Sequence, residues 1–199
     1  MKMWGMTVTR TLLLVPTELE LARLVELGGF PAEAASIELC GFGPVAAAAR
    51  TAQLVARHSP TAVLLVGIAG SYDLARLPLG SAAAFRETAI EGLGQGFPQW
   101  PGIGERITLA SRSQAEPLLL TVCKASGSPA EAEILRARFP GAAAEDMEGF
   151  GVALACALAN VPCTIVRGIS NACGDRNTRG WRIGEALAAA RALALEWLA

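Results

Sequence analysis

The sequence has little of the chemistry that histidine and paired cysteines supply. Its 199 residues include one histidine, His58, which sits before Ser59-Pro60 and fits the surface end of a helix. One such residue supports neither a Ser-His-Asp nor a Cys-His arrangement. The five cysteines are odd in number, lie mostly inside apolar runs and form no Cys-x-x-Cys motif. We therefore expect no disulfide framework and no metal site, and a reducing cytoplasm fits.

Long apolar runs and an excess of one charge are also missing. The N-terminal apolar run Leu12–Val15 ends at Pro16 and is too short for a signal peptide or a membrane span. With 17 basic and 18 acidic side chains, nothing predicts nucleic-acid or membrane binding. The chain is 52% apolar, which is enough for one domain over residues 1–199 with a real core.

Candidate strands and helices alternate along the chain. Strands are expected at Thr9–Val15, Ser36–Cys40, Ala62–Val66, Gly80–Phe85, Leu118–Cys123 and Cys163–Val166. Helices are expected at Thr17–Leu27, from about Gly41 to His58, from Ser128, at Met147–Ala159 and at Trp181–Leu198. Residues 87–104 are rich in Gly, Pro, Gln and Trp and read as a functional loop or lid. Such alternation predicts a parallel-rich sheet with helices on both faces.

Two glycine-rich turns follow candidate strands. Gly41-x-Gly43-x-x-Ala46 has the setting of a dinucleotide fingerprint, but the next strand ends without the carboxylate that an NAD site needs. We expect no cofactor, and this turn either brings backbone close to a substrate sugar or is purely structural. Gly67-Ile68-Ala69-Gly70 follows a buried strand, where backbone N–H groups can face a ligand.

The stretch from Ala142 to Trp181 concentrates polar groups around apolar elements. Its apolar helix is expected to end at Asn160, a left-handed C-cap, before Pro162 and a buried strand. Acidic residues crowd the helix start and further polar residues follow the strand: Glu145, Asp146, Glu148, Arg167, Ser170, Asn171 and Asp175. Because ligands bind outside the carboxyl ends of strands in open α/β sheets, we expect a binding site here.

The motifs EDMEG and RGISN resemble the purine nucleoside phosphorylase and nucleosidase superfamily. Within it, RGISNACGDR followed by Trp181 looks most like the futalosine hydrolases of the alternative menaquinone route, with the methylthioadenosine/S-adenosylhomocysteine nucleosidases as relatives. The resemblance implies an α/β protein, a three-layer α/β/α sandwich with a mixed, mostly parallel central sheet. It also implies a homo-oligomer that hydrolyses futalosine to hypoxanthine and the remaining sugar product.

The resemblance nominates the site residues. Glu20 and Asn171 are implied as catalytic, and Ala69, Gly70, Met147, Glu148 and Ser170 as substrate-binding. Glu20 aligns with the carboxylate that activates water. Glu20 also lies three residues after Thr17 in Thr17-Glu18-Leu19-Glu20, so the structural alternative is a capping box at the start of the helix. Glu18 is the candidate base if the alignment to the family is shifted by two residues.

The remaining assignments also have structural alternatives. Glu148 either accepts from ribose hydroxyls or complements the helix dipole, as Glu145 and Asp146 also could. Met147 packs against sugar or base, or fills the core. Arg167 pairs with a nearby acid or with substrate.

Asn171 stands where adenine-specific relatives have Asp, and its amide suits a 6-oxopurine; otherwise it caps a turn. Other functions kept open are phosphorolysis, adenine-nucleoside hydrolysis and nucleoside binding without turnover.

Overall fold

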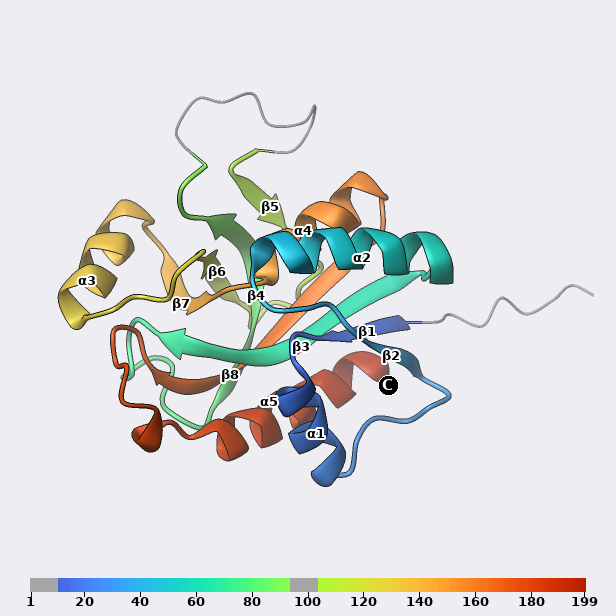
Figure 1. The fold of residues 1–199 in the computed structure, drawn as a ribbon, viewed down its shortest axis with the longest axis horizontal. Coiled ribbons are helices and arrows are strands. Elements are labelled where there is room, and N and C mark those ends of the chain that lie inside the picture. The colour runs from blue at the N-terminus through green and yellow to red at the C-terminus, as the bar shows by residue number, and fades with distance from the viewer. Residues whose placement is uncertain (1–10, 94–103) are drawn as a thin grey trace, which may run out of the picture.

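A computed structural model describes residues 11–93 and 104–199 of the chain (Figure 1). The strands are β1 (Thr11–Val15), β2 (Ala35–Leu39), β3 (Ala62–Ser71), β4 (Ala82–Ile90), β5 (Arg106–Thr108), β6 (Glu116–Thr121), β7 (Ala142–Asp146) and β8 (Cys163–Ala172). The helices are α1 (Glu18–Glu26), α2 (Pro44–His58), α3 (Pro129–Arg138), α4 (Gly149–Leu158) and α5 (Ile183–Leu198), with a short 3₁₀ turn, η1 (Thr178–Gly180), before α5. The alternation of strands and helices agrees with the sequence pattern.

The strands form one mixed sheet, most of whose pairings are parallel, as expected. Within the described ranges β1 pairs in parallel with β2 and β3, β3 with β8, and β6 with β4 and β7. The pairs β3–β7, β4–β5 and β4–β8 are antiparallel. Because β8 joins β3 to β4, the strands β3, β7, β6, β4 and β8 close into a ring. The expected sandwich did not include this closure.

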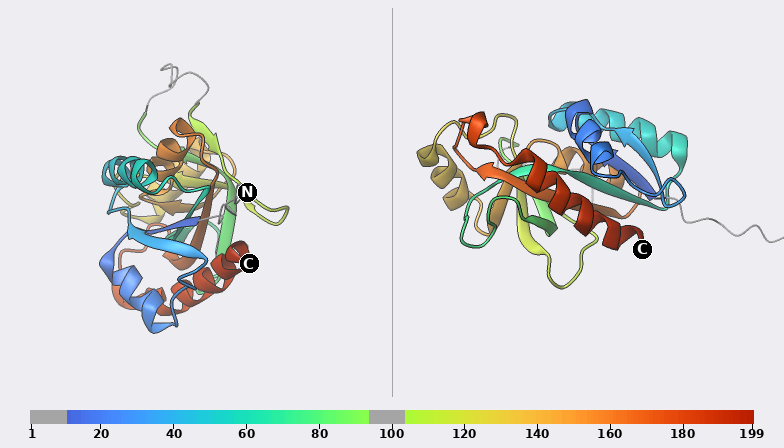
Figure 2. Two further views of the ribbon diagram at one scale, coloured as in Figure 1. Left: turned by 90° about the vertical axis from the view of Figure 1, so that its right-hand side faces the viewer. Right: turned by 90° about the horizontal axis from the view of Figure 1, so that it is seen from below.

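Helices lie on opposite sides of the sheet, and each side has its own apolar core (Figures 1 and 2). Leu54 of α2 and Val152 of α4 belong to one cluster, and these two helices pack against each other. Leu24 of α1 and Leu187 of α5 belong to the second cluster, on the side where α5 crosses β3 and β8. Leu135 of α3 packs in a third, smaller cluster with β6 and β7.

β1 shows why its run of apolar residues forms a strand buried on both faces. Leu12 and Leu14 belong to the first cluster, whereas Leu13 and Val15 belong to the second. Successive side chains of a strand point to opposite faces, so each face of β1 meets an apolar layer. The same alternation places the middle of the sheet between two cores.

β3 and β8 extend well beyond their apolar stretches. The expected strand ends were Val66 in β3 and Val166 in β8, yet both strands continue through the glycine and polar residues to Ser71 and Ala172. They pair with each other along this whole length, with a shift of register between Ala69 and Gly70. Backbone pairing between two neighbours holds these residues in strands although their composition resembles a turn.

Two local expectations need correction. Ala142–Asp146, expected as the approach to a helix, is the buried strand β7, and α4 starts only at Gly149. The loop expected at 87–104 begins later, since β4 runs to Ile90; its residues 94–103 lie outside the described part. Thr9 and Arg10 of the first expected strand also lie outside it. Asn160, with a φ of 55°, confirms the expected left-handed cap of α4.

Candidate active site

A cavity of about 400 Å³ opens where β1, β3, β7 and β8 end. Its wall comes from the ends of those strands, from the first turn of α1 and from the segments that follow β2, β6, β7 and β8. The seven nominated residues all line it: Glu20, Ala69, Gly70, Met147, Glu148, Ser170 and Asn171. Folding therefore joins into one place residues from the first, middle and last thirds of the chain.

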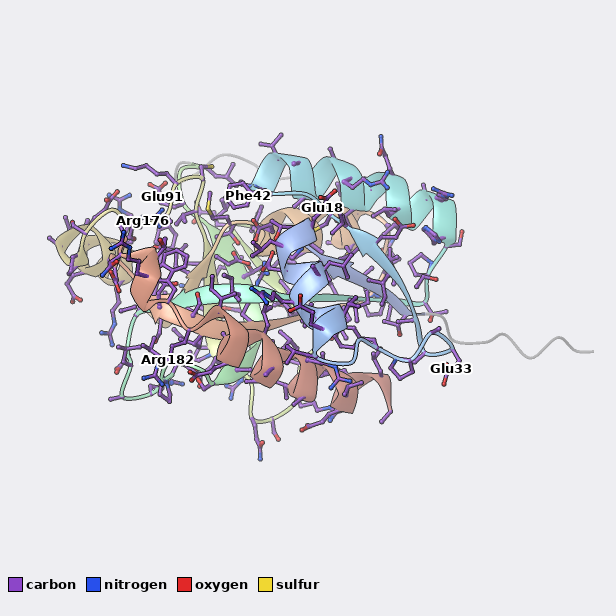
Figure 3. All side chains as sticks on the ribbon, turned by 60° about the horizontal axis from the view of Figure 1, so that its bottom comes forward. Glu18, Glu33, Phe42, Glu91, Arg176 and Arg182 are labelled. Carbon is purple, nitrogen blue, oxygen red and sulfur yellow. The ribbon has the colours of Figure 1, made fainter. Side chains whose placement is uncertain are left out.

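Glu20 lies in the first turn of α1 and is 5% exposed. Its Oε1 accepts from the Ile68 backbone N–H at 3.0 Å, and its Oε2 accepts from the Thr17 hydroxyl at 2.6 Å. The Glu20 N–H donates to Thr17 Oγ1 at 3.2 Å, which is one half of a capping box. In the described residues the carboxylate bridges α1 and β3 and does not complete the box. Glu18 is exposed at the start of α1 and lies outside the cavity wall (Figure 3).

Glu148 precedes α4 and is 4% exposed. Its Oε1 accepts from the Gly43 N–H at 3.1 Å, and its Oε2 accepts from Arg167 Nη2 at 3.2 Å. Burial raises the pKa of Glu148 to about 7, although the charge of Arg167 partly offsets that rise. The turn at Gly41–Gly43 thus directs its Gly43 N–H at Glu148, while Phe42 contributes to the cavity wall.

Arg167 is fully buried on β8 and ties two carboxylates together. Its Nε and Nη2 both donate to Asp146 Oδ2, with Nε at 3.0 Å, and Nη2 also meets Glu148. Of the two readings of this arginine, the structure supports pairing with acids. Its Nη1 packs behind Gly67, where an added Cβ would collide with that nitrogen and with Glu20 Oε1. The glycine therefore allows the arginine and Glu20 to approach each other behind β3.

Ser170 and Asn171 lie next to the C-terminal end of β8. The Ser170 hydroxyl donates to Asn171 Oδ1 at 2.7 Å, and Asn171 Nδ2 donates to the Ala172 carbonyl at 2.8 Å. The second bond is local and resembles the turn-capping alternative, but Asn171 also lines the cavity. A side-chain amide has two N–H groups and two lone pairs on oxygen, so one donor and one acceptor position remain.

Glu145 is a cavity residue that the sequence reasoning missed. It was assigned to the start of a helix, yet it stands near the end of β7 and is 6% exposed. Ser126 donates to it twice, from its N–H to Oε1 at 2.8 Å and from its hydroxyl to Oε2 at 2.6 Å. Tyr72 donates to Oε2 at 2.7 Å. Burial, followed by the charge of Glu145, raises the pKa of Tyr72, so the phenol remains a donor. A carboxylate directly after a short apolar run was the available signal.

Three larger side chains in the wall were also missed. Phe42, Arg176 and Trp181 line the cavity from the loops after β2 and β8. Figure 3 labels Phe42 next to the start of α2 and Arg176 in the segment before α5. The Arg176 guanidinium lies 5.6 Å from the Trp181 ring centroid. Trp181 was expected in the last helix, but that helix begins at Ile183, so Trp181 belongs to the loop.

The charges around the cavity suit a substrate that becomes positive. Four acidic side chains, from Glu20, Glu145, Asp146 and Glu148, and one basic side chain, Arg176, line it. The buried Arg167 neutralises part of the negative charge from behind Asp146 and Glu148. Carboxylates aimed at a developing cation stabilise it most strongly where water is excluded. Among residues 11–93 and 104–199, no three His, Cys, Asp or Glu side chains are grouped as metal ligands.

Sequence comparisons place the chain among known proteins. The model of the phosphorylase superfamily matches residues 111–199. Futalosine hydrolase of Streptomyces coelicolor is 54% identical over 71 residues, which are 36% of this chain and 30% of that protein. The matched part of the chain therefore spans about three tenths of that relative. Futalosine hydrolase of Thermus thermophilus is 35% identical over 171 residues, 75% of this chain and 74% of that protein.

The fold is also found in solved structures. The crystal structure of a 5′-methylthioadenosine/S-adenosylhomocysteine nucleosidase from Colwellia psychrerythraea in complex with adenine superimposes with a TM-score of 0.81. The superposition covers 96% of this chain and 95% of the other, at 23% identity. At that identity the likeness concerns the fold, in which the closed mixed sheet and its helices recur.

Proposed function

We propose, from the premise that the chain belongs to the phosphorylase superfamily, that it hydrolyses the N-glycosidic bond of a purine nucleoside. The preferred substrate is futalosine, and the products are hypoxanthine and the dehypoxanthine sugar, a step of the alternative menaquinone route. The observation that carries this proposal is the grouping of Glu20, Glu148 and Asn171 around one cavity. These three side chains match the three needs of the reaction: a base for water, stabilisation of a cationic sugar, and recognition of the departing purine.

Glu20 acts as the general base in this mechanism. Donors from Ile68 and Thr17 hold its two oxygens in place, and each oxygen keeps a lone pair. A water bound to one of these lone pairs loses its proton to Glu20 as its oxygen bonds to the anomeric carbon. The bond from that carbon to the purine nitrogen breaks, its electron pair leaves with the purine, and the purine takes up a proton from solvent. A positioned base contributes about 10²- to 10⁴-fold to the rate.

Glu148 binds the sugar hydroxyls and places negative charge beside the oxocarbenium-like transition state. Gly43 and Arg167 fix the orientation of its carboxylate, while Met147 forms the adjoining apolar surface. Arg167 does not reach the substrate in this mechanism. It keeps Glu148 oriented and balances the charge of Asp146, which is part of the cavity wall.

Asn171 recognises the purine edge, with Ser170, Ala69 and Gly70 beside it. The free N–H of its amide donates to O6 of hypoxanthine, or its oxygen accepts from a protonated N7. A carboxylate at this position would meet O6 with lone pair against lone pair. The amide therefore favours a 6-oxopurine, which is the base of futalosine.

The main alternative is hydrolysis of an adenine nucleoside, since a structural neighbour is a methylthioadenosine/S-adenosylhomocysteine nucleosidase in complex with adenine. Phosphorolysis is a second alternative. The deciding experiment incubates the protein with futalosine, inosine and methylthioadenosine, with and without phosphate, and identifies the sugar product. We expect a free reducing sugar from futalosine in both buffers. A sugar 1-phosphate would establish phosphorolysis, and no turnover of any nucleoside would leave only a binding protein.

The chain is further proposed to form a homo-oligomer in the cytoplasm. Phe42, in the cavity wall, and Val45, in the first turn of α2, are 65% and 80% exposed, and such apolar side chains suit contact with a second copy. The five cysteines are free thiols, which fits a reducing compartment. No helix among the described residues is both long and apolar enough to cross a bilayer.

A further inference from the structure

We infer that Arg176 and Trp181 form a subsite for an anionic group of the substrate, a carboxylate at the end of an apolar or aromatic arm on C5′ of the sugar. The inference rests on the proposed function, because it assumes a purine at Asn171 and sugar hydroxyls at Glu148. It assigns a role to the mouth of the cavity, which the proposed mechanism does not use. The substrate class is then a purine nucleoside with an acidic C5′ substituent.

The segment between β8 and α5 carries this subsite, and backbone hydrogen bonds fix both of its ends. The Asp175 N–H donates to the Ala172 carbonyl at 3.1 Å, in a turn that contains Gly174 with a φ of 84°. The Arg182 N–H donates to the Ser170 carbonyl at 2.8 Å. The segment therefore leaves the end of β8 and returns to it, and its side chains are held beside the cavity.

Arg176 and Trp181 are paired within this segment. The indole N–H of Trp181 donates to the Asp175 carbonyl at 3.2 Å, which orients the ring. The Arg176 guanidinium lies over that ring, 5.6 Å from its centroid. A guanidinium that lies over an aromatic face is held by it and still directs its N–H groups outward in its own plane. The pair thus presents an oriented set of donors to an acceptor in the cavity.

The charge of Arg176 is available to a ligand. None of the ion pairs within residues 11–93 and 104–199 involves this arginine. The adjacent Asp175 uses its Oδ1 to accept from the Asn177 N–H at 2.9 Å. Arg176 is also the only basic side chain in the described part of the cavity wall. An exposed arginine elsewhere would be an ordinary solvated side chain, and the place of Arg176 in this wall distinguishes it.

The charges of the wall favour an anion at the mouth and disfavour one deeper in the cavity. Glu20 and Glu145 are 5% and 6% exposed, whereas Arg176 is an exposed side chain. Repulsion between like charges is stronger where water is excluded, so the inner carboxylates repel a carboxylate of the substrate. The same group is attracted at the mouth, and the wall therefore orients a substrate that carries it.

The sugar has one free position from which an arm can extend to this subsite. In the proposed binding mode the purine occupies C1′ and Glu148 accepts from the hydroxyls, so the substituent on C5′ remains. The wall near solvent is apolar, with Leu19 and Phe42 61% and 65% exposed and Trp181 half-buried. Apolar surface suits an apolar or aromatic arm. A single guanidinium suits the one charge of a carboxylate, which it binds through two parallel N–H···O bonds.

The test compares two inosine derivatives that differ only at the end of the arm: 5′-deoxy-5′-(4-carboxybenzylthio)inosine and its methyl ester. Binding is measured by calorimetry with the Glu20→Gln protein, so that turnover does not interfere. We expect the acid to bind about 10-fold more tightly than the ester, because the ester loses hydrogen bonds between charged groups. This difference should shrink as the salt concentration rises, since the pair is close to solvent.

Variants in the same Glu20→Gln background locate the effect. Arg176→Met should bring the ratio of the two affinities close to one. Arg176→Lys should keep only part of it, because an ammonium group lacks the planar arrangement of donors. Arg179→Met is the matched control, because Arg179 is an exposed arginine of the same segment outside the described cavity wall, and it should keep the ratio.

The outcomes separate this inference from the proposed function. Equal binding of acid and ester, or the same loss of preference in Arg176→Met and Arg179→Met, would overturn the subsite. Inosine 5′-monophosphate that binds more tightly than the acid, and does so only with Arg176 present, would overturn the assignment to a carboxylate arm. Failure of wild type to hydrolyse any purine nucleoside would overturn the proposed function, while the affinities of acid and ester would still decide the role of Arg176.

Discussion

The two ends of the cavity hold their carboxylates in different ways. At the proposed sugar end, Glu148 shares a buried arginine with Asp146, and Glu20 lies beside the same guanidinium behind Gly67. At the proposed base end, Glu145 is held by uncharged donors from Ser126 and Tyr72. Because ion pairs hold the carboxylates at the sugar end, a substitution there should change both the activity and the stability of the protein. Neutral donors let the base end change its hydrogen-bond pattern with smaller effects on folding.

Removal of the proposed base should produce the largest effect on the sugar end. Glu20→Gln keeps the shape and the acceptor for Ile68 but cannot take a proton from water. We expect kcat for futalosine to fall by about 10²- to 10⁴-fold with little change in ligand binding. Glu18→Gln, two residues away and exposed, is the matched control and should remain active. The reverse result would move the base role to Glu18.

The next effect concerns stability at the same end. Arg167→Met removes the only cation that pairs with Asp146 and Glu148 in the described residues and leaves both carboxylates buried. Breaking a buried pair in this way costs about 3–5 kcal/mol in the free energy of unfolding. Arg23→Met, which removes an exposed pair with Glu26, should cost less than about 1 kcal/mol. Urea unfolding of wild type and both variants measures these losses in the free energy of unfolding. Similar losses for the two variants would contradict the prediction.

At the base end, the expected effect is on selectivity. Asn171→Asp replaces the proposed donor to O6 by an acceptor and should change the preference for 6-oxo over 6-amino nucleosides by about 10- to 100-fold. The quantity to measure is kcat/KM for futalosine and for its 6-amino analogue on both proteins. Melting temperature should change little, in contrast to Arg167→Met. An unaltered ratio would remove Asn171 from base recognition.

The last prediction concerns the dependence of stability on pH at Glu148. Burial raises its pKa from an ordinary value of 4.5 to about 7, so the folded protein holds this proton more tightly than the unfolded chain. Stability contributed by the protonated group is therefore present below pH 4.5 and is lost as pH rises toward 7. Glu148→Gln lacks this titration. The stability of wild type relative to Glu148→Gln should fall between pH 4.5 and 7, and a constant difference would contradict the raised pKa.

Prediction from sequence succeeded where the signal is local. The residues Thr9–Val15 predicted the first strand, which the structure shows from Thr11, and Asn160 before Pro162 predicted the end of α4. Resemblance to the nucleosidases nominated residues that all line the cavity. Glu145 was misplaced because Ala142–Asp146 looks like the entrance to the helix that follows. Its strand conformation depends on pairing with β6 and β3, and neither partner is adjacent in the sequence.

The sequence by itself determined the α/β class, the alternation of elements and the motifs that mark the superfamily, because apolar periodicity and short motifs are properties of neighbouring residues. Only the tertiary structure decided that the sheet closes through β8, that Arg167 pairs with Asp146 and Glu148, and that Glu145 and Asn171 flank Gly70. Each of these depends on the register between strands that are distant along the chain. Register is set by which side chains the two apolar cores accept, and that is a property of the whole fold.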